Sequence, residues 1–251
     1  MKGAKAGRID ASGLHYRDLN AKLRALTDQR EVGCIELVNV CGQRYIGSNL
    51  RVPVDLQIHG TPGNDLAAFM DGPRVEVRGN AQDGCGNTMN SGEVVIHGRA
   101  GDVTGHSMRG GRIFIRDDVG YRVAIHMKEY QDRKPVIVIG GTAQHFLGEY
   151  MAGGVLVVLG LTLGDGERHT ANFIGTGMHG GVMYIRGRVD DHQLGREVGR
   201  VPLEERDQEV LANLVADYVA HFGGDVVSIL AHHFTKLVPL SARPYGRLYA
   251  Y

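Results

Sequence analysis

Two hydrophobic residues separated by a single position recur six times along the middle of the chain. The pairs are Val75/Val77, Val94/Ile96, Ile113/Ile115, Ile137/Ile139, Leu156/Val158 and Met183/Ile185. Alternation with a period of two is typical of a β-strand that buries one face. The pattern therefore predicts six short strands of one kind, with Leu56/Ile58 as a less regular member before them.

The methionines show that these strands belong to a longer repeat. Six of them form a series: Met70, Met89, Met108, Met127, Met151 and Met178. The first four are each 19 residues apart, and the last two follow after 24 and 27 residues. A Gly or Ala stands three residues before each of them. Because methionine fills irregular gaps well, we expect these side chains to stack in the core. The longer intervals contain polar or Gly-rich insertions near 128–134 and 161–168, which we expect to be loops.

A unit of 19 residues with short strands and glycine corners cannot bury its apolar residues alone, but a stack of such units can. The composition agrees, because 37 of the 251 residues are glycine, about twice the average share, without the period of collagen. The sequence therefore predicts an all-β fold, a single-stranded right-handed parallel β-helix. We expect about seven coils, one per repeat, spaced about 4.8 Å apart.

The two ends of the chain differ from the repeat. Helical spacing of apolar residues predicts one helix over residues 14–28 and another over 202–222, with a strand over 31–40. We divide the chain into an N-terminal helix and strand (1–39), the β-helix repeats (40–199) and a C-terminal helix and tail that pack on them (200–251), all in one structural unit. Since a solenoid has two exposed ends, we expect short capping helices at both.

The outward positions of the repeated strands change character along the chain. Early coils carry charged residues there, whereas the fifth and sixth coils, counted from that of Leu56/Ile58, carry Val136, Val138, Val155, Val157 and Leu159. A strand that is apolar on both faces must be covered on both. We expect the helix near residues 203–222, or a partner protein, to cover these valines. The same apolar outer face is where the chain could also associate with a second copy of itself.

The charge, hydropathy and cysteine content of the chain argue against nucleic-acid binding, membrane insertion and a disulfide or zinc framework. Lys and Arg together number 28, as do Asp and Glu, so there is no basic field to hold a nucleic acid. No apolar run approaches the roughly 20 residues of a membrane helix, and the start of the chain shows no signal-peptide core. We therefore expect a cytoplasmic protein. Cys34, Cys41 and Cys85 form no CxxC pair, and we expect reduced, mostly buried thiols.

The chain contains one sequence match to a dinucleotide-binding motif, in the wrong structural context, and no serine-nucleophile motif. The segment Gly175–Gly180 matches G-x-G-x-x-G, but a strand-like stretch follows it, whereas a dinucleotide site needs a helix N-terminus there. Ser107, Ser228 and Ser241 lie outside any G-x-S-x-G elbow. We predict neither a cofactor site nor a serine nucleophile in this chain.

The twelve histidines do not form a predicted metal site. His59 and His97 hold the same repeat position two coils apart, nearly 10 Å by the strand spacing, which is too far to share one ion. His106 and His126 fall one position out of register, so we expect them to point in different directions. The adjacent His232 and His233 should face opposite ways.

One pair of carboxylates merits a separate hypothesis. Asp83 and Asp102 share a repeat position on adjacent coils, about 5 Å apart, which is near the separation used by retaining glycosidases. Their flanking residues are typical of turns in which Asp hydrogen-bonds its own backbone. We favour the turn interpretation and assign no catalytic, cofactor-binding or metal-binding residue to the chain.

Four segments and the glycine repeat resemble a known family. The segments are IDASGLHYRDLN at 9–20, NVCGQRYIG at 39–47, GRAGDVTG at 98–105 and FTKLVP at 234–239. Together they resemble the C-terminal β-helix (GXGXG-repeat) domain of the glutamate synthase large subunit, here as a separate chain. The glycine-repeat subunit of formylmethanofuran dehydrogenase is a more distant resemblance that covers mainly the coils.

This resemblance implies a non-catalytic structural subunit of a glutamate synthase-type complex, which makes glutamate from glutamine and 2-oxoglutarate. Its partners would be glutamine amidotransferase and FMN-binding synthase subunits, with FMN and iron–sulfur clusters in those chains and no cofactor in this one. Two alternatives remain open: a scaffold of a formylmethanofuran dehydrogenase-like or other oxidoreductase complex, and an independent β-helix hydrolase that uses Asp83 and Asp102. The electron donor and the stoichiometry of the complex are also open.

Overall fold

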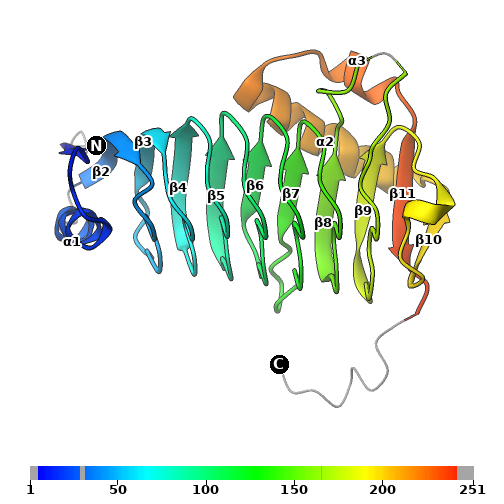
Figure 1. Ribbon diagram of the computed structural model, residues 1–251, viewed down its shortest axis with the longest axis horizontal. Helices are drawn as coiled ribbons and strands as arrows, with labels where there is room; N and C mark the ends of the chain where they lie inside the picture. Colours follow the sequence, from blue (N-terminus) through cyan, green and yellow to red (C-terminus); the bar gives the residue numbers. More distant parts are fainter. Residues whose placement is uncertain (1–4, 29–31, 165, 242–251) are drawn as a thin grey trace.

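A computed structural model describes residues 5–28, 32–164 and 166–241. They form an elongated parallel β-solenoid of about six coils with few helices (Figure 1). The strands are β1 Lys5–Asp10, β2 Val32–Cys41, β3 Asp55–Thr61, β4 Asp71–Arg78, β5 Ser91–Ile96, β6 Arg112–Ile115, β7 Val136–Ile139, β8 Ala152–Val158, β9 Gly180–Arg186, β10 Val198–Val201 and β11 Phe234–Pro239. The helices are α1 Tyr16–Thr27, α2 Glu205–Phe222, α3 Val226–Leu230 and the short 3₁₀ helix η1 Asp191–Gln193.

The described strands form one sheet in the order β1 to β9, then β11 and β10. Strands β1 to β9 pair in parallel, and the predicted alternating pairs lie in register from coil to coil, as in Val75 with Val94 and Val94 with Ile113. Both members of each pair face inward and are buried. The two insertions form loops between strands, as predicted.

The six repeated methionines are buried, with at most 1% of each side chain exposed. Four of them, Met70, Met89, Met127 and Met151, reach toward a glycine of the following coil. A Cβ atom built on Gly111 would lie 2.5 Å from Cε of Met89, and one on Gly181 would lie 2.6 Å from Cε of Met151. The glycines after the methionines therefore leave the space that the preceding methyl group fills, and the predicted core row is confirmed.

The residue three positions before each methionine lies at a tight corner. Gly105 has a φ of +73°, and a Cβ atom built there would lie 2.3 Å from Cδ1 of Ile137 in the core. Ala67 and Ala124 hold the same position with φ of 58° and 61°. A left-handed backbone that faces the core explains why only Gly and Ala occupy this site.

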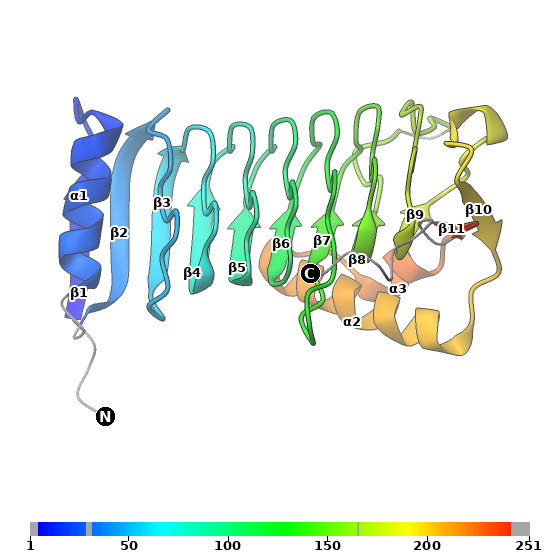
Figure 2. The same ribbon diagram turned by 90° about the horizontal axis from the view of Figure 1, so that it is seen from below.

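Helix α2 lies along the outer face of β6–β9 and covers its apolar side chains (Figure 2). Val138, Val157 and Leu159 are fully buried there against Leu211 and Val215 of the helix. The predicted cover over the apolar strands is confirmed, and it comes from this chain. That face is therefore not free for self-association as the sequence suggested.

The ends of the solenoid are closed by different means. Helix α1 covers the N-terminal end with Leu19 and Leu23, as predicted, and β1 adds a parallel strand that the sequence did not indicate (Figure 2). At the other end α2 runs along the side of the sheet and does not cap it. The antiparallel strands β10 and β11 extend the sheet there and bring Leu237 into the core. Within the described ranges, no helix has the length and apolar character needed to cross a bilayer.

Candidate functional site

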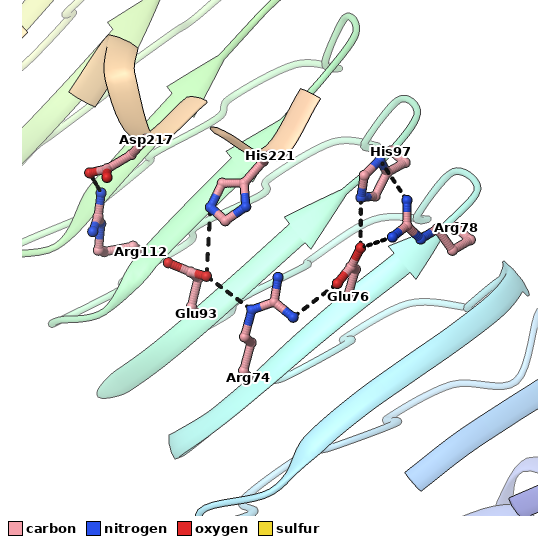
Figure 3. Close-up of polar contacts among 8 residues, drawn as sticks. All are labelled: Arg74, Glu76, Arg78, Glu93, His97, Arg112, Asp217 and His221. Carbon is pink, nitrogen blue, oxygen red and sulfur yellow. Dashed lines mark hydrogen bonds and ion pairs between the residues drawn. The ribbon is translucent and has the colours of Figure 1, made fainter. Parts of the chain in front are cut away.

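The outer face of the sheet has two halves. The half over β6–β9 is covered by α2 and α3, whereas the neighbouring half over β2–β5 carries the charged side chains that the sequence places outward. Ion pairs join these side chains across the strands and reach the end of α2 (Figure 3). We call this set of Arg74, Glu76, Arg78, Glu93 and His97 the charged network.

Glu76 of β4 is the centre of the charged network, and only 9% of the residue is exposed. Its carboxylate pairs with Nη1 of Arg74 at 2.9 Å, Nη2 of Arg78 at 2.5 Å and Nε2 of His97 at 3.0 Å. Burial raises the pKa of Glu76, but the hydrogen bond and charge of Arg74, the charge of Arg78 and the hydrogen bond of His97 together outweigh it, so the pKa is lowered. Glu76 is therefore ionised and held in place.

The charged network also anchors the C-terminal end of α2. Glu93 Oε1 lies 3.2 Å from Nε of Arg74 and 3.6 Å from Nε2 of His221 on the helix. One coil further, Arg112 pairs with Asp217 of the helix (Figure 3). Burial and the nearby Arg78 charge lower the pKa of His97, so its ring is neutral at pH 7. The network positions a helix and presents a fixed charged surface, and its carboxylates are occupied by neighbouring cations.

The structure gives Asp83 and Asp102 a backbone role. Oδ1 of Asp83 accepts the N–H of Asp102 at 2.9 Å, and Oδ1 of Asp102 accepts the N–H of Tyr121 at 2.8 Å. Each carboxylate thus joins its coil to the next one, whereas we predicted a bond within its own turn. Both residues are exposed at a corner. The geometry supports a structural use of this pair and offers no enclosed site for a glycan.

The histidines are distributed over separate contacts. His59 lies 3.2 Å from Glu36, and His232 bonds the carbonyl of Ser228. The expectation that His106 and His126 point apart is wrong, because their ring centroids are 6.1 Å apart at an edge-on angle on neighbouring corners. In the described part of the chain, no group of three or more His, Cys, Asp or Glu is placed to hold a metal ion.

The remaining sequence candidates also have structural places. The G-x-G-x-x-G segment leads into strand β9, and a Cβ atom on Gly177 would lie 2.3 Å from the ring of Tyr150, so the glycine makes room for a side chain of the previous coil. Of the three thiols only Cys85 is buried, while Cys34 is half-buried and Cys41 exposed. The prediction of mostly buried thiols is therefore wrong for Cys41. Burial raises the pKa of Cys85 to about 12, which makes it unreactive.

One feature was missed by the sequence reasoning. A groove of about 630 Å³ lies between α1 and the corners of the first coils, lined by Tyr16, Tyr45 and Phe69 among others. Phe69 and Tyr150 occupy the position just before the repeated methionine, and both are about half exposed. Large aromatic residues at an outward corner position are a signal that could have indicated this surface.

Comparison with known proteins agrees with the architecture. The GXGXG motif family matches residues 15–241, which include the solenoid, α1, α2 and β11. The uncharacterized protein MJ1350 of Methanocaldococcus jannaschii is 48% identical over 256 residues, which cover 99% of this chain and 98% of that protein. The match over most of the chain agrees with the resemblance to the glutamate synthase domain. The chain belongs to the GXGXG motif family.

Proposed function

We propose that this chain is the non-catalytic structural subunit of a glutamate synthase-type complex in the cytoplasm. The observation that carries the proposal is the GXGXG family match over residues 15–241, which extends from α1 through the solenoid to β11. In the complex, glutamine amidotransferase and FMN-binding synthase subunits would hold the catalytic groups, FMN and the iron–sulfur clusters. The proposal includes two details predicted from the sequence repeat: that the solenoid is right-handed and that it has about seven coils.

The geometry of the solenoid favours a structural role in a complex. Stacked coils joined by a continuous parallel sheet make a rod whose surface residues stay at fixed distances from one another. The rod buries its apolar face under its own helix and leaves a charged network beside it. Such a body can hold two enzymes in a constant relative position without contributing a reacting group.

The test is to isolate the complex from cells that produce a tagged full-length chain at its native level. Mass spectrometry identifies the bound chains, and the isolated complex is assayed for glutamate formation from glutamine and 2-oxoglutarate. We expect amidotransferase and FMN-binding chains in fixed ratio with this one. Their absence would refute the proposal, and chains of a formylmethanofuran dehydrogenase in their place would establish the alternative scaffold.

The hydrolase alternative has its own control. The purified chain alone is incubated with glycans and esters, beside an Asp83→Asn variant that keeps the oxygen accepting the Asp102 N–H. We expect no hydrolysis by either protein. Activity that the parent shows and the variant lacks would favour the hydrolase over the structural subunit.

A further inference from the structure

The groove beside α1 has a volume of about 630 Å³ and is larger than three other hollows on the surface of the described residues. One wall is the helix, with Tyr16, Arg17 and Arg24. The other wall is formed by the corners of the first coils, with Tyr45 and Phe69. Of the helix only Leu19, Leu23 and Thr27 are buried, so other side chains of α1 are left to line this space.

The aromatic walls of the groove are exposed to solvent. Tyr45 is 42% exposed and Phe69 is 51% exposed. On later coils the corner rings stack on one another, as His126 does on Tyr150 at 5.3 Å. Phe69 has no such ring contact within the described residues. Exposed aromatic side chains in a hollow are typical of the residues that contribute most to protein interfaces.

The charges in the groove are not balanced as they are in the charged network. Arg17 and Arg24 are exposed, and neither lies within ion-pair distance of a carboxylate in the described part of the chain. The acidic residue in the groove is Asp65, whose Oδ1 accepts a hydrogen bond from Nδ2 of Asn87 at 3.1 Å. Arg24 also lines a second groove, together with Arg51 and Asp28. The surface is thus complementary to negative charge.

We propose that this groove binds an acidic segment of a partner chain, which inserts an apolar side chain beside Phe69 and Tyr45 and places carboxylates against Arg17 and Arg24. The inference rests on the proposed function, and it names the surface by which the subunit holds one of its enzymes. A small molecule is disfavoured because ligand pockets enclose most of the ligand surface, whereas these walls remain about half exposed.

The test uses the full-length chain with each purified partner, the amidotransferase and the FMN-binding subunit, in separate titrations. Arg24→Glu reverses a charge in the groove, and Lys22→Glu is its control, because Lys22 is exposed on the same helix but lines neither groove. Phe69→Ala removes the exposed ring, and Tyr150→Ala is its control at the same position of a later coil. Circular dichroism melting verifies that all four variants are folded.

We expect Arg24→Glu and Phe69→Ala each to weaken the binding of one partner about tenfold or more, while the two controls stay within about twofold. Raised salt should weaken the parent and reduce the difference between Arg24→Glu and Lys22→Glu. If the parent binds a partner and all four variants bind it equally, the groove assignment is overturned and the proposed function survives. If the parent binds neither purified subunit, the proposed function fails, and the assignment fails with it.

Discussion

Replacement of Gly111 by alanine tests how the methionine row and the glycine corners fit together. Gly111 has a φ of +81°, in the left-handed region that L side chains rarely adopt. A Cβ atom there would lie 2.5 Å from Cε of Met89 and 2.8 Å from the backbone oxygen of Gly92. The methionine could shift, but the carbonyl belongs to the sheet and is held by it.

The magnitude follows from two costs. Left-handed backbone strain costs about 1 kcal/mol for alanine. Overpacking against Met89 and the Gly92 carbonyl adds about 1–3 kcal/mol. Gly13 supplies the control, since its φ is +67° and nothing lies within 4 Å of a Cβ built there. Gly13→Ala should therefore carry the strain alone, about 1 kcal/mol.

The assay is thermal unfolding of the parent, Gly111→Ala and Gly13→Ala, followed by circular dichroism in one buffer. For a chain of this length, 1 kcal/mol shifts the midpoint by about 3 °C. We expect a decrease of about 3 °C for Gly13→Ala and about 6 to 12 °C for Gly111→Ala. Equal decreases in the two variants would show that the methionine methyl group does not occupy the space above Gly111.

Three further predictions concern the core, the helix and pH. Met108→Ala should cost about 2–5 kcal/mol in urea unfolding because it leaves a cavity, whereas Met108→Leu should cost less than about 1.5 kcal/mol; equal costs would contradict this. Tyr218→Phe removes the 3.0 Å hydrogen bond to the Arg116 carbonyl, so we expect a loss of about 1 kcal/mol and faster proteolysis of α2. Burial lowers the pKa of His169 below 6.5, so the unfolded chain takes up a proton first and stability should fall as pH drops below about 6.5. His169→Gln should flatten that dependence between pH 7 and 5, and an unchanged slope would exclude this histidine.

The repeat could be predicted because its contacts have a fixed separation in sequence. Each coil packs on the next, about 19 residues away, so a residue type that recurs at that interval must recur at one place in the fold. The buried row of Met70 and its counterparts, the register of the strands and the small residues at the corners all follow from this rule. The apolar outer residues such as Val157 likewise required a cover, whatever its source.

The contacts without a period depended on the tertiary structure. An apolar face on α2 shows that the helix must be buried, but only the folded chain places it along the sheet and leaves the end of the solenoid to β10 and β11. Asp83 was predicted to bond its own turn and instead accepts an N–H from the next coil. The groove is lined by Arg24 of α1 and by Phe69 at a corner of the solenoid, which have no regular separation in sequence, so no sequence spacing predicts it. Periodicity alone determines which residues stack, whereas the placement of helices and ends depends on which competing apolar surfaces bury each other best.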